Sequence, residues 1–328
     1  MMFFLMCSER SGSNFITRLM NAHSQICGPA TKHLINPLAR NLFRYEPVQD
    51  PEHWRELLDD VHRLLNVDFS IWKTKFTRDV LDGLAEPGDV KSLIEGIYYT
   101  EAKAHGKDHV FIKENHLYEF MTFLLLRYPD AMFVYLVRDP RDMALSWKEH
   151  SAHPGGVVRA AKQWKKDQQN YLKLHNDLRK SGRSYPLRYE DLLEDPEHHL
   201  NRLLAWMGFA YEEQMLEFHQ DELTQANAEV HPAWKNLSQG ILNSNKGKYR
   251  NRLREKEIKT IEKICYYEMR LLGYDPEFTH KSLGKLKDAQ IEALQREEAE
   301  HFERSIPDAV KQNMDAKKVF YRKEIDNA

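Results

Sequence analysis

The chain has 328 residues and carries 48 basic and 50 acidic side chains, for a formal net charge of −2. Near-neutral charge argues against a broad nucleic-acid-binding surface, and 41% hydrophobic residues suffice for a large core. Three cysteines are too few for a disulfide framework, and the apolar run at residues 1–7 is too short to cross a membrane. We therefore expect a globular, cytoplasmic protein with no membrane span and no nucleic-acid partner.

Four short apolar runs predict buried, parallel β-strands. They are Phe3–Met6, Val110–Ile112, Met132–Val137 and Tyr185–Leu187. Helical spacing of apolar residues marks longer segments between and after them: Trp54–Leu65, Val157–Leu178, Pro196–Met207 and Glu255–Leu272. This alternation predicts an α/β fold, a P-loop-like parallel sheet flanked by helices on both faces. In such sheets, ligands bind at the carboxyl ends of the strands.

A polar loop, residues 8–14, follows the first predicted strand and precedes a helical pattern. Gly12 lets the backbone approach a ligand, free amides at the helix start attract an anion, and Arg10 adds positive charge. The loop lacks the Gly-Lys-Ser/Thr ending of a Walker A motif. An ordinary strand–helix turn would explain the same composition. The residues of this predicted anion site are Arg10, Ser11, Gly12, Ser13 and Asn14.

A second candidate anion site begins at the end of the third predicted strand. Arg138 lies at the strand end, and Ser146 lies about two turns into the next helix, which Asp139 would cap. A guanidinium and a hydroxyl in this arrangement can hold a phosphate. The alternative is that Arg138 only pairs with Asp139 or Asp142 at the surface.

Two further segments are unremarkable on their own, a capped acidic turn at residues 189–192 and a basic loop at residues 246–251. Together and in this order, the four segments resemble the sulfotransferases that use 3′-phosphoadenosine 5′-phosphosulfate (PAPS). The resemblance covers roughly residues 1–276. It implies that the Arg10–Ser13 loop holds the phosphosulfate and that Arg138 and Ser146 hold the 3′-phosphate. It also implies that Tyr189 contacts the adenine side and that a late loop closes over the 3′-phosphate, with Lys246, Gly247, Lys248 and Arg250 as its residues.

The resemblance also indicates where a general base for the acceptor would lie. One segment contains His33, where one bacterial branch of the family has a nearby glutamate that Thr31 replaces here. The other follows the second predicted strand and contains Lys113, which matches the lysine that approaches the transferring group, together with Glu114 and His116. A histidine suits proton transfer near neutral pH. We rank His33 first as the base, His116 second and Glu114 third.

The sequence therefore predicts an enzyme that moves a sulfuryl group from PAPS to a hydroxyl or amine of a small-molecule, lipid or carbohydrate acceptor. Transfer would be in line, with PAPS as co-substrate and no metal ion. A P-loop kinase-like phosphotransferase is one alternative, but it would need a loop lysine and an acidic magnesium ligand. A nucleotide-binding module without catalysis is the other.

The last part of the chain differs from the rest in charge. Residues 281–328 carry ten basic and ten acidic residues, 20 of 48. A modest helical stripe lies among these charges: Leu283, Leu286, Ile291 and Leu294. We expect a sulfotransferase domain at 1–276 and a charged helical extension at 277–328 that packs on the core or on the second subunit of a homodimer. The extension follows every donor motif, so we expect the chemistry not to need it.

Overall fold

The computed structural model describes residues 1–328 except 151–152, 231, 301, 303–304 and 323–328. Its centre is a five-stranded sheet in which every pairing is parallel. The strand order is β2-β3-β1-β4-β5. The strands are β1 Met2–Cys7, β2 Ile26–Cys27, β3 His109–Lys113, β4 Met132–Val137 and β5 Ser184–Arg188. The four predicted strands are confirmed, whereas β2, with only two residues, was not predicted.

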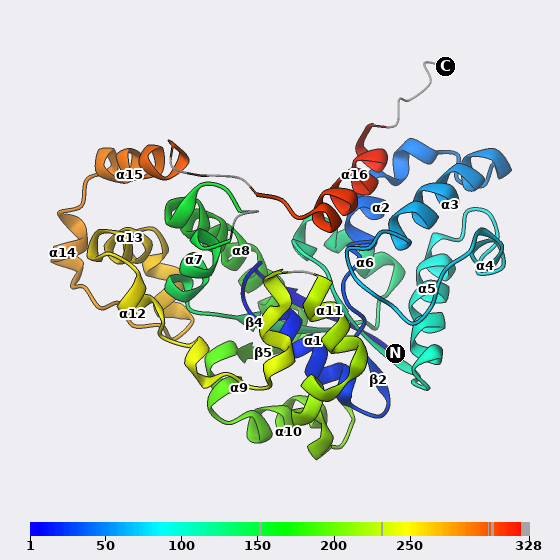
Figure 1. The fold of residues 1–328 in the computed structure, drawn as a ribbon, viewed down its shortest axis with the longest axis horizontal. Helices are drawn as coiled ribbons and strands as arrows, with labels where there is room; N and C mark the ends of the chain where they lie inside the picture. The colour runs from blue at the N-terminus through cyan, green and yellow to red at the C-terminus, as the bar shows by residue number, and fades with distance from the viewer. Residues whose placement is uncertain (151–152, 231, 301, 303–304, 323–328) are drawn as a thin grey trace.

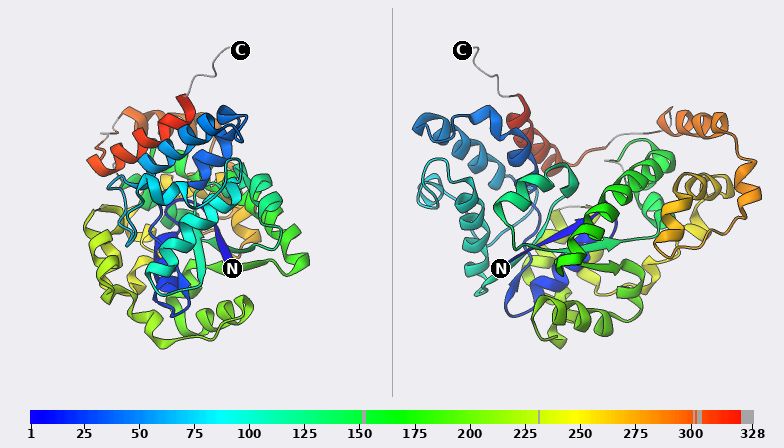
Figure 2. Two further views of the ribbon diagram at one scale, coloured as in Figure 1. Left: turned by 90° about the vertical axis from the view of Figure 1, so that its right-hand side faces the viewer. Right: turned by 180° about the vertical axis from the view of Figure 1, so that it is seen from behind.

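Sixteen α-helices surround the sheet in the described part of the chain and cover both of its faces (Figures 1 and 2). The helices are α1 Ser13–Ala22, α2 Ile35–Asn41, α3 Pro51–Leu65, α4 Arg78–Asp82, α5 Val90–Ala104, α6 Met121–Arg127, α7 Pro140–Lys148, α8 Gly156–Leu178, α9 Tyr189–Glu194, α10 Pro196–Met207, α11 Glu222–Val230, α12 Tyr249–Arg252, α13 Glu255–Leu271, α14 His280–Gly284, α15 Asp288–Glu300 and α16 Asp308–Arg322. The predicted α/β fold is thus confirmed.

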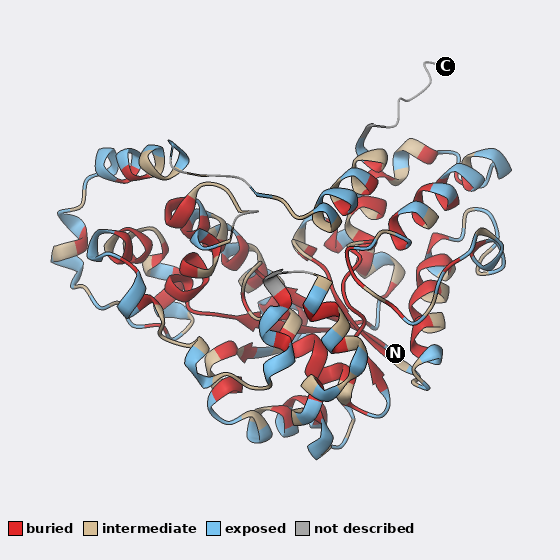
Figure 3. Ribbon diagram, in the orientation of Figure 1, coloured by how far each residue is buried: buried red, intermediate tan, exposed pale blue. Residues whose placement is uncertain are grey.

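The strands β1, β3 and β4 are almost wholly buried because the sheet is covered on both sides (Figure 3), whereas the edge strand β5 is partly exposed. All six residues of β1 are buried, which fits its central place and its continuous apolar run. Parallel pairing aligns Leu5 with Lys113 and Val137 with Arg188, so the carboxyl ends of these strands lie along one edge. The polar segments that follow β1, β3, β4 and β5 therefore meet at that edge.

Short capping signals fix where the helices after β4 and α9 begin. The Asp139 carboxylate accepts a hydrogen bond from the Arg141 amide at 2.8 Å, with Pro140 as the first residue of α7. Asp195 caps α10 in the same way, through the amide of His198 at 3.1 Å. Because the proline has no amide hydrogen to satisfy, each Asp-Pro pair starts its helix at a defined residue.

The C-terminal segment packs on the rest of the protein. Helix α15 lies against α8, and Glu298 accepts hydrogen bonds from the first amides of α8, Val157 at 2.8 Å and Val158 at 3.2 Å. Helix α16 lies against α2 and α3 on the other side (Figure 1). The division at residue 276 stays a prediction. The three cysteines are buried and free, and within the described residues no helix is long and apolar enough to cross a membrane.

Candidate functional site

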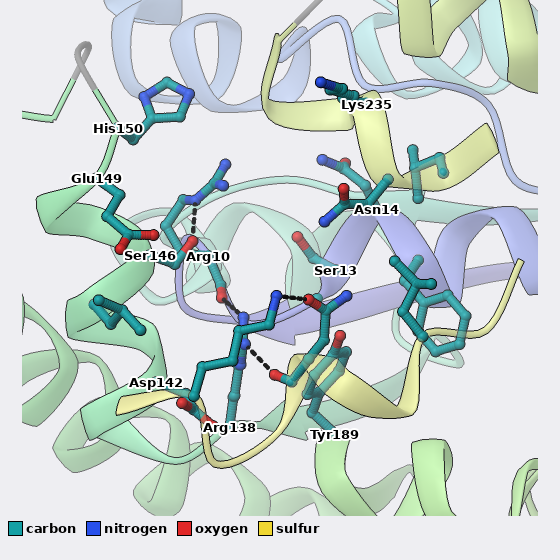
Figure 4. A pocket seen from close by; sticks show the side chains of 18 of the residues that line it. Arg10, Ser13, Asn14, Arg138, Asp142, Ser146, Glu149, His150, Tyr189 and Lys235 are labelled. Carbon is teal, nitrogen blue, oxygen red and sulfur yellow. Dashed lines mark hydrogen bonds between the residues drawn. The ribbon is translucent and has the colours of Figure 1, made fainter. Parts of the chain in front are cut away.

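A cavity of about 460 Å³ opens at the carboxyl edge of the sheet (Figure 4). Its walls come from the β1–α1 loop and the start of α1, from α7 and the residues just after it, from α9, and from the segment between α11 and the end of α12, with Pro307 from the C-terminal extension. This volume is within the range of small-molecule sites. Eight of the twelve residues predicted to bind the donor line it: Arg10, Gly12, Ser13, Asn14, Arg138, Ser146, Tyr189 and Lys248.

The N-terminus of α1 forms one wall of this cavity. Gly12, in the N-cap position, has a φ of +87° and no side chain to cap the helix. The first backbone bond of the helix runs from the Ile16 amide to the Gly12 carbonyl at 3.2 Å, so the preceding amides lack an intrahelical acceptor. Ser11 supports the loop from inside, because its hydroxyl donates to the Ser8 carbonyl at 2.6 Å and does not line the cavity.

Gly12 also makes room for Tyr189. A Cβ atom at this position would overlap the ring carbons of Tyr189. We expect Gly12→Ala to lower the free energy of unfolding by about 2–4 kcal/mol, since it adds this overlap to the strain of a positive φ.

Gly208→Ala is the matched control, because Gly208 has the same φ of +87° but open space around its Cα. That change should cost only about 1 kcal/mol. Urea denaturation of both variants measures the difference. If the two variants lose the same free energy of unfolding, the overlap with the Tyr189 ring adds no cost, and this explanation for Gly12 is wrong.

Arg138 is held in the cavity wall by its neighbours. Its guanidinium stacks on the Tyr189 ring at 4.6 Å and donates to the carbonyls of Arg10 at 2.9 Å and Asn245 at 2.8 Å. The Trp164 indole donates to the Arg138 carbonyl at 2.9 Å. The Arg138 Nε is buried and has no hydrogen-bond partner among the described residues. A donor left unpaired at a cavity wall is suited to an anionic ligand.

The acidic residues after Arg138 have other partners. Asp139 pairs with Arg141 at 2.7 Å, and Arg141 also reaches Glu262 at 2.7 Å. The Asp142 carboxylate accepts hydrogen bonds from the backbone amides of Gly247 and Tyr249. The surface ion pair considered for Arg138 is therefore replaced by a buried network around Arg141, and Arg138 itself lines the cavity.

Positive charge gathers in this cavity. Arg10 Nε donates to Ser146 Oγ at 3.1 Å (Figure 4), which joins the two predicted anion sites. Burial, together with the charge of Arg138, lowers the pKa of Arg10 to about 10. The cavity is lined by five basic residues, Arg10, Arg138, Lys235, Lys248 and Arg252, and by two acidic residues, Asp142 and Glu149. Repulsion between buried guanidinium groups is relieved when an anion binds between them.

The late basic loop contributes less to the cavity than the sequence suggested. The ammonium of Lys246 pairs with Glu194 at 2.8 Å, and Arg250 pairs with Glu277 at 2.8 Å; neither residue lines the cavity. Gly247 does not line the cavity either, and its backbone amide donates to the Asp142 carboxylate. Lys248 alone of the four predicted loop residues lines the cavity.

Several lining residues were missed by sequence reasoning. They include Lys235, Asn245 and Arg252 near the late loop, His150 just after α7 and Pro307 in the C-terminal extension. Lys235 and Asn245 lie in short 3₁₀ turns without periodic spacing, so no local pattern marks them. Arg252 directly follows the predicted loop at residues 246–251, and extending that loop by one residue would have found it.

A second group of predicted residues lies beside the donor loop. His33 Nδ1 is 3.5 Å from Glu114 Oε2, and the Ile35 amide donates to Glu114 Oε1 at 3.0 Å. Burial raises the pKa of Glu114 to about 7. Because Glu114 contacts the imidazole, it can orient His33 and stabilise its protonated form. The structure thus brings the first-ranked and third-ranked base candidates together.

Lys113 lies at the end of β3, next to Glu114. Its side chain is buried, with 8% exposed, and its ammonium forms no hydrogen bond or ion pair with the described residues. Burial lowers the pKa of Lys113, while Glu9 and Glu114 oppose that shift. An ammonium held in this way is available to a group with developing negative charge.

His116 occupies a different part of the same region. Its Nε2 lies 3.4 Å from the Gln163 side-chain amide, and its ring is 5.8 Å from the Tyr118 ring. The neighbouring Asn115 donates to Glu9 at 2.7 Å, which ties this segment to the donor loop. Glu9, another residue that sequence reasoning missed, also lies 3.5 Å from His153.

Backbone strain is concentrated in these segments. Among the described residues, the non-glycine residues with positive φ are Arg10 at +62°, His33 at +55° and His116 at +53°. Such conformations are maintained only where the surrounding structure enforces them, and they are common at functional sites. All three residues had been selected from the sequence as site residues. Within the described part of the chain, no group of His, Cys, Asp or Glu is arranged to hold a metal ion.

Comparisons with solved structures agree with this fold. The sulfotransferase domain of the Synechococcus PCC 7002 olefin synthase is 19% identical, with a TM-score of 0.53, over 81% of this chain and 94% of that domain. The sulfotransferase domain from the curacin biosynthetic pathway is 17% identical, with a TM-score of 0.54, over 84% of this chain and 97% of that domain. These likenesses concern the fold. No curated protein sequence matches the chain closely enough to count as a relative.

The family is established by a match along the sequence itself. The model of the sulfotransferase family matches residues 3–213, which is more than half of the chain and includes the donor loop, the His33 loop, Glu114, Arg138 and Tyr189. This chain therefore belongs to the sulfotransferase family.

Proposed function

We propose that this chain transfers a sulfuryl group from PAPS to a hydroxyl or amine of a small-molecule, lipid or carbohydrate acceptor. One observation carries the proposal: the open N-terminus of α1, Arg10 and Arg138 all line one cavity. PAPS has anionic groups at both ends of its adenosine, so it requires positive charge at two separated places. In our proposal the α1 amides and Arg10 hold the phosphosulfate. Arg138, Ser146 and Lys248 hold the 3′-phosphate.

The chemistry follows from the residues beside the donor loop. The acceptor oxygen or nitrogen attacks the sulfur atom and gives its proton to His33, which Glu114 orients. The bond between sulfur and the 5′-phosphate oxygen breaks, and adenosine 3′,5′-bisphosphate (PAP) leaves with that oxygen. Lys113 neutralises the charge that develops on the leaving oxygen. Because side chains and amides supply this charge, we infer that the transfer needs no metal ion. The three buried, free cysteines fit our inference that the enzyme is cytoplasmic.

Binding of PAP tests this proposal. We expect PAP at about 100 times its Kd to stabilise the folded chain by about 2.7 kcal/mol. This should raise the midpoint of thermal unfolding by roughly 5 °C. Adenosine 5′-monophosphate, which lacks the 3′-phosphate, is the control and should give a much smaller shift. No shift with millimolar PAP, or a larger shift with ATP and magnesium, would contradict the proposal and favour a kinase-like enzyme.

A further inference from the structure

The C-terminal helix α16 returns to the part of the fold that carries His33. It packs on α2 and α3, far from α15, as Figures 1 and 2 show. Phe320 is fully buried with its ring 6.2 Å from that of Tyr45, and Ala316 is buried one turn earlier. This apolar face anchors the helix, which the sequence had suggested is not needed for the chemistry.

Asn313 connects this helix to the peptide bond before His33. Asn313 is 1% exposed, and its side-chain amide donates to the Lys32 carbonyl at 3.3 Å. The His33 amide, at the other end of that peptide bond, donates to Thr31 Oγ1 at 3.3 Å. Both polar groups of this peptide unit are thus held by side chains, at a residue whose φ is +55°. The position of α16 is therefore fixed relative to the candidate base.

Lys317 follows Asn313 by four residues, so it lies on the same face of α16, between Asn313 and Phe320. This face looks towards α2, whose first amide donates to Glu114. Burial lowers the pKa of Lys317, while Glu114 and Glu9 oppose that shift and Lys113 adds to it. Reciprocally, Lys317 lowers the pKa of both carboxyl groups. The geometry agrees: one turn before Lys317, Asn313 reaches the Lys32 carbonyl, and one turn after it, the Tyr321 ring lies 6.0 Å from the Arg40 guanidinium on α2. Lys317 therefore faces the segment that carries the His33–Glu114 pair.

We propose that Lys317 is a positioning residue of the sulfuryl-transfer site, which balances the buried charge of Glu114 and thereby keeps this carboxylate able to orient His33. The inference rests on the proposed function. It makes α16 a part of the site although it follows the donor motifs by about 60 residues.

The charged and titratable groups around Glu114 come from several elements. Lys113 on β3 and Lys317 on α16 lower its pKa, and His33 contacts it directly. Two tyrosines, Tyr98 on α5 and Tyr321 on α16, have their own pKa raised in part by Glu114. Neutral phenols carry no positive charge near pH 7. When Lys317 is removed, Lys113 is therefore the remaining lysine that lowers the pKa of Glu114 against the effect of burial.

The experiment follows the Glu114 carboxyl carbon by NMR in full-length protein labelled with ¹³C-glutamate, assigned by comparison with Glu114→Gln. We expect Lys317→Gln to raise the pKa of Glu114 by about one unit, because a nearby cation is lost. Lys317→Arg keeps the charge and should titrate like the wild type. Lys318→Gln is the matched control, because Lys318 pairs with Asp315 at 2.6 Å on the surface and should leave Glu114 unchanged.

The outcomes separate this inference from the proposed function. If the protein binds PAP but Lys317→Gln leaves the Glu114 titration unchanged, only the role of Lys317 is overturned. An equal shift in Lys318→Gln would also overturn it, because the effect would then not depend on position. Failure to bind PAP would overturn the proposed function and the inference with it.

Discussion

Replacement of His33 by asparagine is expected to lower the turnover number of sulfuryl transfer by about 10²- to 10⁴-fold and to leave PAP binding intact. In our proposal, the change removes the group that takes the proton from the acceptor. Asparagine is preferred over alanine because it tolerates the positive φ of +55° at this position, so the backbone can remain in place. The rate is measured with labelled PAPS and the acceptor that the wild type uses best in a screen.

Two controls show whether the loss comes from the base. His198→Ala removes a histidine from the first turn of α10 and should leave the rate unchanged. PAP affinity of the His33 variant, measured by calorimetry, should stay within about threefold of the wild type. A large loss of PAP affinity would instead assign His33 to the donor site. A variant with the wild-type rate would move the role of base to His116.

The pH dependence of the wild type follows from the same pair. Burial raises the pKa of Glu114 to about 7, so the carboxyl group becomes neutral as the pH falls through this value. We therefore expect the rate to fall on the acid side of pH 7 as Glu114 loses its charge.

The free energy of unfolding changes in the opposite direction over this pH range. Because the folded pKa lies above the unfolded one, the folded state gains stability as the pH falls from about 7 to about 4.5.

Much of the fold could be predicted from local pattern. The strands β1, β3 and β4 contain continuous apolar runs because both faces of a parallel sheet are buried, whereas the edge strand β5 has only a short one. The Asp-Pro pairs at Asp139 and Asp195 mark helix starts for a stereochemical reason, and both were correct. Strand β2 was missed because two residues, Ile26 and Cys27, are too few to form a pattern.

The donor site could be predicted in part, for a similar reason. Arg138 and Tyr189 directly follow strands, and Arg10 and Gly12 lie in the loop after β1, so topology brings all four to one edge. Which way a loop side chain points depends on its contacts. Arg250, for example, is drawn to Glu277, 27 residues later in the chain. The return of α16 to the His33 loop depends on packing between distant segments, and no short motif records it.

Arg138→Ala is expected to weaken PAP binding by about 10²- to 10³-fold, because in our proposal its guanidinium holds the 3′-phosphate at a buried wall. Calorimetry with PAP measures this loss. The effect on stability should be smaller, since Arg138 repels Arg10 in the free protein and its removal relieves that repulsion. Arg138→Lys should fall in between, because an ammonium keeps the charge without the bidentate geometry.

Arg250→Ala is the decisive comparison, because sequence and structure disagree about this residue. The resemblance places Arg250 on the 3′-phosphate, whereas its side chain is 59% exposed and pairs with Glu277 outside the cavity. If the loop keeps this arrangement when PAP binds, Arg250→Ala should change PAP affinity by less than about threefold, as expected for an exposed ion pair. A loss as large as that of Arg138→Ala would mean that the loop closes over the ligand and exchanges Glu277 for phosphate. The ratio of the two losses therefore distinguishes a preformed donor site from one that its ligand completes.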